Sequence, residues 1–295
     1  MSYSITQFFH PPRMLYLNSK FATLTADKSK NNHCWFSLQE SITIPRGYNN
    51  VLLAVTDAQI PISFYTVNET NNIIGLTFQS FNSDFNIPTE IVIPYGNYDA
   101  YTLAYLVQEK MNTCLRLNID LFALPWTQIS VSITYDIISN KYTFKPTISP
   151  LATDLNLALN FKGFSYILWG FNDNQTSYDL TSTLISQNTI DLSGSRFLFI
   201  QSPSFSTHNI NSKTGSTNQI LAKIPITSDY LEIQQWTNDV GFQNKITTQA
   251  LTISVIEIVI LDENLNDIDF QGGQWAISLS ITILGESPEE LIAMK

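Results

Sequence analysis

From Trp275 to Ile283, large apolar side chains alternate with the small or polar side chains of Ala276, Ser278, Ser280 and Thr282, and no other feature constrains the fold of the chain as strongly. Successive side chains of a strand point to opposite faces, so this period of two predicts a half-buried β-strand. The segment Leu251–Leu261 is apolar on both faces except at Glu257, which is typical of strands covered on both sides. Further strands are predicted at Trp35–Ile42, Val51–Ile60, Ile73–Gln79, Glu90–Ile93, Ile129–Tyr135, Lys141–Phe144, Arg196–Gln201, Gln219–Ile226 and Tyr230–Ile233.

One segment has the periodicity of a helix instead. Its apolar side chains recur three and four residues apart and therefore share one helix face. These residues are Leu103, Leu106, Val107, Met111 and Cys114. Before them, Gly96 and Asn97 tolerate positive φ and predict a turn, and Asp99 is the expected N-cap, whose carboxylate accepts free N–H groups of the first turn. A second, short helix is predicted at Ala152–Leu159, because Leu155 and Leu159 lie four residues apart.

Many short strands, one convincing helix and no regular alternation of strands with helices predict an all-β fold, a jelly-roll sandwich with one or two short helices. The expected parts are an N-terminal arm at 1–32 with a short strand around Met14–Leu17, a jelly-roll domain at 33–285, and a C-terminal tail at 286–295. An insertion is a candidate within 112–218, either at Asn112–Phe171 or in the polar 202–218 loop. Because terminal segments are usually ordered by a partner, we expect the arm to be less ordered in the isolated protein.

Charged residues make up only 14% of the 295 residues, well below the roughly 25% of an average soluble domain. Asn, Ser, Thr and Gln must then supply the polar surface, which suits a protein covered by partners and equally a poorly soluble β-protein. The net charge of −10 makes nucleic-acid binding an unfavoured function. The arm is locally basic, so it is either an ordinary solvated segment or a surface that faces nucleic acid weakly or an acidic neighbour. Its charged residues are Arg13, Lys20, Asp27, Lys28 and Lys30.

Known catalytic and metal-binding motifs are missing from the sequence, which has no Gly-x-Ser-x-Gly elbow, phosphate loop or His-Glu-x-x-His. The three histidines, His10, His33 and His208, have no partners at zinc-ligand spacing. The turn at 262–267 imitates the start of a calcium loop, but Asp267 and Gly273 stand where that loop requires glycine and a bidentate glutamate. We therefore expect no catalytic, cofactor or metal site. A glycosidase remains an open alternative, because its two carboxylates need no fixed spacing.

The two cysteines, Cys34 and Cys114, are too few for a disulfide framework and fit a reducing compartment. The sequence leaves open whether they pair. Met1–His10 has neither the basic start nor the apolar run of a secretory signal. The most apolar run, Ile253–Leu261, is far shorter than the ~20 residues of a membrane helix, so no membrane insertion is expected.

Several stretches resemble, in order, the minor capsid (penton) proteins of virophages and related Polinton-like viruses. The first is the strand ending in Ile60-Pro61, followed by Phe64-Tyr65 and Asn71-Asn72; the second is Ile93-Pro94-Tyr95-Gly96-Asn97-Tyr98 with the helix from Leu103. Later stretches are Leu221–Ile226, Ile258–Glu263, Ile268–Gly272 and Trp275–Leu279, the last two strands resembling a closing pair. The motif residues are Pro61, Tyr65, Pro94, Gly96, Asn97, Tyr98, Asp99, Leu103, Gly272 and Trp275.

The resemblance implies a structural capsid protein that forms homopentamers at the five-fold vertices of an icosahedral virion and is made in the host cytoplasm. The implied partners are further copies of itself and a major capsid protein with a double jelly roll, and a host receptor is a further candidate. The alternative function is a carbohydrate-binding jelly-roll module or receptor-binding domain, which the aromatic residues and polar loops would suit. The sequence identifies neither the virus nor the residues of the ring interface.

Overall fold

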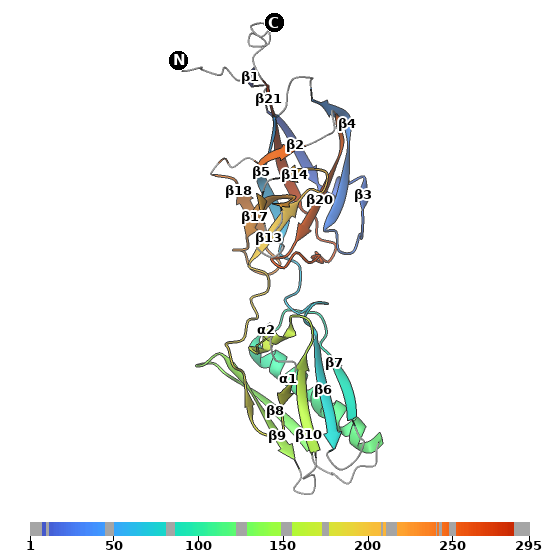
Figure 1. Cartoon of the computed structure of the whole chain (residues 1–295), viewed down its shortest axis with the longest axis vertical. Helices are drawn as coiled ribbons and strands as arrows, with labels where there is room; N and C mark the ends of the chain where they lie inside the picture. The colour runs from blue at the N-terminus through green and yellow to red at the C-terminus, as the bar shows by residue number, and fades with distance from the viewer. Residues whose placement is uncertain are drawn as a thin grey trace. The chain divides into compact units, whose positions relative to one another are not determined.

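The computed structural model describes residues 8–9, 12–44, 50–80, 86–121, 129–148, 155–172, 177–207, 209–210, 217–239, 241, 244–247 and 252–285. The chain divides into two compact units (Figure 1). The inserted unit is Tyr65–Gly194, and the terminal unit combines Met1–Phe64 with Ser195–Lys295. From the sequence, an insertion is expected within 112–218, whereas the inserted unit begins at Tyr65 and ends at Gly194.

Two antiparallel sheets form the terminal unit. In the larger sheet, the order β1-β21-β5-β19-β14 is extended by β2 on β21 and by β18 on β5. Its strands are β1 (Phe8–Phe9), β2 (Arg13–Asn18), β5 (Asn50–Pro61), β14 (Ser206–Thr207), β18 (Ile233–Thr237), β19 (Asn244–Thr247) and β21 (Ala276–Gly285). The smaller sheet has the order β17-β13-β20-β4-β3. Its strands are β3 (Leu24–Thr25), β4 (His33–Thr43), β13 (Phe197–Gln201), β17 (Ile220–Pro225) and β20 (Thr252–Leu261), and a separate ribbon pairs β15 (Asn209–Ile210) with β16 (Thr217–Asn218).

The connection order of the main strands is that of a jelly roll. Numbered along the chain, β2, β4, β5, β13, β17, β18, β20 and β21 are the first to the eighth of these strands. One sheet then has the order first, eighth, third and sixth, and the other has the order second, seventh, fourth and fifth. Two sheets connected in this way are a double-sheet jelly roll, which confirms the predicted fold class. The inserted unit enters between the third and fourth of these strands.

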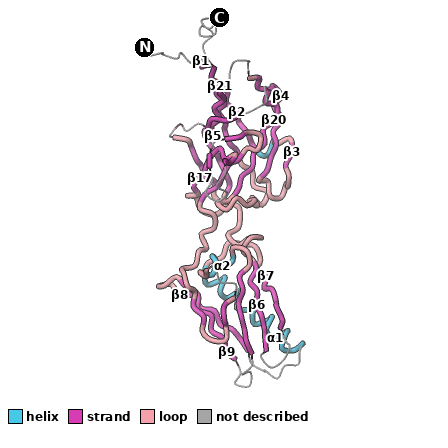
Figure 2. Tube along the Cα trace, viewed as in Figure 1, coloured by secondary structure: helices cyan, strands magenta, loops and turns pink. Residues whose placement is uncertain are grey.

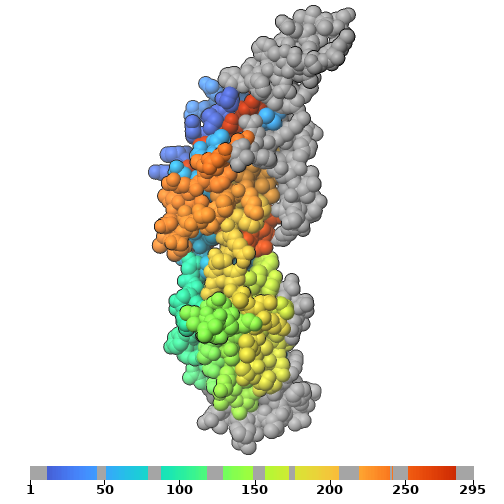
Figure 3. Space-filling view, turned by 90° about the vertical axis from the view of Figure 1, so that its left-hand side faces the viewer, coloured from blue at the N-terminus to red at the C-terminus, as the bar shows by residue number. Residues whose placement is uncertain are grey.

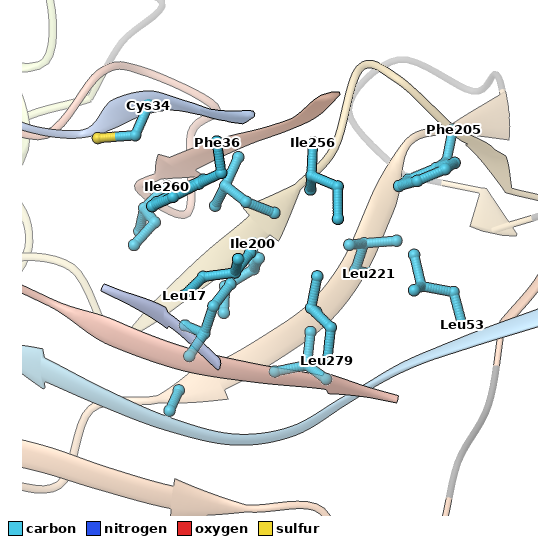
Figure 4. Packing of buried hydrophobic residues seen from close by; sticks show 14 of the residues in the cluster. Leu17, Cys34, Phe36, Leu53, Ile200, Phe205, Leu221, Ile256, Ile260 and Leu279 are labelled. Atoms are coloured by element: carbon cyan, nitrogen blue, oxygen red, sulfur yellow. The ribbon is translucent and has the colours of Figure 1, made fainter. Parts of the chain in front are cut away.

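The core of the terminal unit lies between its two sheets. Leu17, Leu53 and Leu279 project from the larger sheet toward Phe36 and Ile260 of the smaller one (Figure 4). All are buried, because alternate residues of each strand face the opposing sheet. The periodicity of β4 and β21 in the sequence thus becomes the inner faces of a sandwich.

The inserted unit contains the two α-helices of the described residues (Figure 2). One sheet has the order β11-β10-β6-β7 and the other the order β12-β9-β8, with antiparallel pairing throughout. The helices are α1 (Ala100–Leu121) and α2 (Ser165–Trp169). The strands are β6 (Ile73–Ser80), β7 (Asn86–Val92), β8 (Ile129–Asp136), β9 (Lys141–Ile148), β10 (Leu155–Phe161), β11 (Tyr178–Asp179) and β12 (Leu184–Ile185). The predicted hairpin of β8 and β9 is confirmed by their continuous register.

Three local predictions are wrong. The helix expected at Ala152–Leu159 is instead strand β10 from Leu155 onward, with Leu157 and Leu159 buried against β6. Residues 230–232 form a turn with Leu231 at φ 70°, so β18 begins only at Ile233. The strand predicted at Glu90–Ile93 begins four residues earlier, since β7 starts at Asn86 and pairs with β6 along its whole length.

The last two strands do not form a pair with each other. β20 pairs with β4 and β13, whereas β21 pairs with β5 and β2, so the turn after Leu261 carries the chain from one sheet to the other. Residues 12–32 likewise differ from the expected arm. The short strand around Met14–Leu17 is confirmed by β2, but Ser19, Asn31 and Asn32 are buried in the terminal unit. These polar side chains bind backbone and side-chain atoms of the unit, so this part of the chain packs against the unit.

Candidate functional site

The potentially reactive side chains of His33 and Cys34 are engaged in packing and hydrogen bonding within the terminal unit. In the described part of the chain, no three His, Cys, Asp or Glu side chains gather as a metal site would require. His33 Nε2 lies 2.6 Å from Glu257 Oε1, and the imidazole stacks on Trp35 at 4.0 Å between ring centroids. Cys34 points into the core, where burial raises the pKa of its thiol. No disulfide joins Cys34 to Cys114, and the two cysteines belong to different units.

The first group of motif residues joins the start of the inserted unit to the start of its long helix. Val67 and Gly96 form an antiparallel bridge, with N···O distances of 3.0 and 3.1 Å. Thr66 N donates to Asn97 Oδ1 at 2.7 Å, so the asparagine holds the neighbouring segment rather than a ligand. On the other side, Asn72 Nδ2 donates to the Ile93 carbonyl at 3.2 Å. The two stretches of the resemblance that lie far apart in sequence are thus neighbours in the structure.

Gly96 and Asn97 do not have the positive φ that the sequence analysis expects of them. Gly96 instead packs closely against Tyr98, because a Cβ built there would lie 3.2 Å from the ring and would require the ring to shift slightly. The Tyr98 hydroxyl donates to the Pro94 carbonyl at 2.9 Å and closes the turn. Burial raises the pKa of this phenol.

Helix α1 begins directly after this turn. Asp99 Oδ1 accepts from the Thr102 amide and Oδ2 from the Thr102 hydroxyl, both at 2.8 Å, which is the contact of an N-cap. These hydrogen bonds lower the pKa of Asp99. The Tyr142 hydroxyl donates to the Ala100 carbonyl at 2.9 Å, and Leu103 is fully buried. The Asp99 cap, the Tyr142 hydroxyl and the buried Leu103 together hold α1 on the sheet.

Side chains of α1 also form hydrogen bonds with the backbone of β8 on the edge that no described strand pairs with, a role that the sequence did not predict. Asn112 Oδ1 accepts from the Val131 amide at 2.8 Å, and its Nδ2 donates to the Val131 carbonyl at 3.0 Å. Gln108 Oε1 accepts from the Ile133 amide at 2.8 Å. In this way the helix replaces a neighbouring strand, and covering an edge in this manner blocks unwanted strand pairing. The signal in the sequence was the spacing of two amide side chains, Gln108 and Asn112, which stand four residues apart on one face of the helix.

The second group of motif residues lies in the terminal unit, around the loop before β21. Trp275 Nε1 donates to the Asn31 carbonyl at 2.7 Å, and both residues are buried. Gly272 has φ +73°, and its amide donates to the Ser29 carbonyl at 2.8 Å. Next to it, a Cβ on Gly273 would lie 3.0 Å from Pro61 Cγ. The loop therefore packs tightly against the segment that sequence analysis assigned to an arm.

Two further motif residues have simple positions. Pro61 is the last residue of β5, where it pairs with Ile233. Tyr65 is half-buried and is the first residue of the inserted unit, and its carbonyl accepts from Asn68 Nδ2 at 3.3 Å. The motif residues accordingly form two separate clusters, one in each unit. In both clusters their contacts hold turns of the chain in place.

A comparison with models of protein families finds no match, and neither does a comparison with curated proteins. Among solved structures, the chain is similar to the mavirus penton protein, with a TM-score of 0.46 and 11% identity, over 92% of this chain and 99% of that one. It is also similar to the D2–D3 domains of the flagellar cap protein FliD from Escherichia coli, with a TM-score of 0.21 and 12% identity, over 91% of this chain and 98% of that one. Both TM-scores lie below 0.5, so neither likeness decides fold or function. A bilayer-spanning length of apolar helix is not found in the described residues.

Proposed function

We propose that this protein is a structural subunit of an icosahedral virus capsid, a minor capsid protein that forms homopentamers at the five-fold vertices. The observation that carries the proposal is the jelly-roll connection order of the terminal unit, on a chain with the ordered motifs of the penton resemblance. Jelly rolls occur in viral capsid proteins, lectins and cupins, so the fold alone does not select a function. The ordered motifs select the capsid protein among these classes.

The positions of the motif residues support this choice. In an enzyme or a lectin, shared residues would be expected to converge on a pocket or an exposed binding surface. Here Asn97, Asp99 and Trp275 bind backbone atoms of their own unit and shape turns. For a capsid subunit the folded shape and its contacts are the function, so scaffold residues are the ones that such a family would share. The proposed partners are further copies of the chain and a double-jelly-roll major capsid protein, in the virion.

The proposal is tested by the mass of the assembly. Purified full-length protein is examined by sedimentation velocity over a wide concentration range and by negative-stain electron microscopy, alone and with the major capsid protein of the same virus. Five-fold rings are expected. A protein that stays monomeric in both conditions would refute the proposal.

A receptor-binding or carbohydrate-binding role is a second candidate, and it is compatible with the first. Three tyrosines of the inserted unit are more than half exposed, Tyr95, Tyr101 and Tyr105, and the last two are one helical turn apart on α1. Aromatic rings with a polar tip are common at binding surfaces. Glycan-array binding that is lost in Tyr105→Ala would support this role, whereas binding that the substitution leaves unchanged would remove α1 from it.

A further inference from the structure

The terminal unit has two exposed edges that differ in charge. The basic edge comprises β2, β3 and the residues between and after them, and it carries Arg13, Met14, Tyr16, Lys20, Phe21, Leu24 and Lys28, with Asp27 as the one opposing charge. Four of these side chains are large and apolar, and Tyr16 and Phe21 are 78% and 75% exposed. The acidic edge comprises β18 and the turn before it, with Asp229, Leu231, Glu232 and Ile233. Leu231 and Ile233 are 74% and 59% exposed.

Strand β2 of the basic edge and strand β18 of the acidic edge lie on opposite sides of the larger sheet, and β3 is the edge strand of the smaller sheet. A single row of the sheet runs from Tyr16 through Ser278 and Asp57 to Thr237. Three strand spacings therefore separate the edge strands, or about 14 Å between their backbones. In Figure 3 the residues of β17 and β18, drawn in orange, face the viewer, while in Figure 1 β3 lies on the opposite side of this unit from β18.

Each edge also has backbone that pairs with one strand alone, and at β18 two of the outward carbonyls, those of Ile233 and Gln235, accept from Ser228 Oγ at 3.4 Å and Gln234 Nε2 at 3.0 Å. Among the described strands, β2 pairs only with β21, β3 only with β4, and β18 only with β5. Exposed strand edges invite another strand unless charge or a covering segment prevents it. Here the apolar side chains at both edges are flanked by charges of opposite sign, so each edge disfavours a copy of itself and suits the other.

We propose that the basic edge of one subunit binds the acidic edge of the next, so that the occupant of each edge is a second copy of this chain. The assignment rests on the proposed homopentamer and adds the surfaces that form it. Because the two edges are different surfaces on opposite sides, the contact is heterologous and leaves one free edge at each end of a dimer. Such a contact closes only as a ring. The basic residues 13–28 then face an acidic neighbour, one of the two interpretations that the sequence left open.

Charge reversal on full-length protein tests the assignment. Lys20→Glu with Lys28→Glu makes the basic edge acidic, and Asp229→Lys with Glu232→Lys makes the acidic edge basic. Each double variant is expected to shift the midpoint concentration of ring assembly upward by at least tenfold, and the quadruple variant, in which the contact is again complementary, is expected to recover most of it. Lys145→Glu with Arg116→Glu, on exposed residues of the inserted unit, changes the net charge as the first variant does and should assemble like the wild type.

Mixing the two double variants gives a stricter test. Their edges complement each other only in alternation, which a ring of five cannot maintain, so the mixture should form even-numbered or open assemblies but few complete pentamers in native mass spectrometry. Rings that form normally in the wild type and in every reversed variant would overturn the assignment and leave the proposed function intact. A wild type that never forms rings would instead overturn the proposed function, and the assignment with it.

Discussion

Replacing Asn112 by alanine should selectively unprotect strand β8. The substitution removes both hydrogen bonds to Val131, one accepted from its amide and one donated to its carbonyl. A hydrogen bond contributes about 1 kcal/mol net, so their loss costs about 2 kcal/mol. Alanine is the better helix former and returns about 0.5 kcal/mol. The inserted unit should therefore lose about 1.5 kcal/mol of stability, and exchange of the Val131 amide, measured by NMR, should accelerate by at least tenfold.

Two variants control this experiment. Asn112→Asp keeps an acceptor for the Val131 amide but has no donor for the carbonyl, so it should leave amide exchange slower than in the alanine variant. Thr113→Ala alters the neighbouring, exposed position of the helix and should leave Val131 protected. If Val131 exchange in Asn112→Ala matched the wild type, the idea that α1 covers the edge of β8 would be wrong. A change of stability without local exchange would point to helix propensity or packing instead.

Three other perturbations test the packing of the two units. Trp275→Phe should lower the free energy of unfolding, measured in denaturant, by about 1–3 kcal/mol beyond the loss of packing, because the Asn31 carbonyl loses its donor. Trp169→Phe is the control, since the buried Nε1 of Trp169 has no hydrogen-bond partner among the described residues and its removal should cost packing alone. Gly170→Ala should destabilise the inserted unit by at least 1–2 kcal/mol in thermal melting, because φ is +69° and the added Cβ would lie 2.4 Å from the Asn188 carbonyl oxygen; wild-type melting would contradict this. Cys34 should resist alkylation until the terminal unit unfolds. Since burial raises its pKa, the folded state holds the neutral thiol, and the stability of this unit should be constant below the ordinary cysteine pKa of about 8.5 and fall as pH rises above it; a Cys34 that reacts as fast as a free thiol at pH 8 would refute its burial.

The sequence predicts strands where burial on one face is regular. β4, β8 and β21 have this pattern, and their positions are confirmed within a few residues. At β10 the residues Leu155, Leu157 and Leu159 fit a period of two, but Leu155 and Leu159 also fit a helix turn, and the spacing alone does not separate the two. Pairing with β6 decides the matter, and this depends on residues about eighty positions away.

For a similar reason, local sequence patterns could not predict which sheet a strand joins. β20 and β21 follow each other across a polar turn, as the strands of a hairpin do, yet each pairs with strands from the first part of the chain. The burial of Asn31 and Asn32 is equally non-local, since their partners include Gly273 and Asp267. Polar residues at the start of the chain suggest a solvated arm until the loop that accepts their hydrogen bonds is known.

The motif residues and the residues of the proposed ring surfaces are different sets. Substitutions that impair folding can therefore be told apart from substitutions that impair assembly. Asn97, Asp99 and Trp275 hold turns within a unit, so their substitution should lower stability before it changes assembly. Tyr16 and Leu231 have most of their surface exposed, so substituting them should leave the monomer folded. A resemblance carried by scaffold residues therefore identifies the fold that presents an interface but not the interface itself. The ring contact has to be inferred from what the folded unit exposes, which is two edges that carry exposed apolar side chains and opposite charges, built on the opposite edge strands β2 and β18 of the larger sheet.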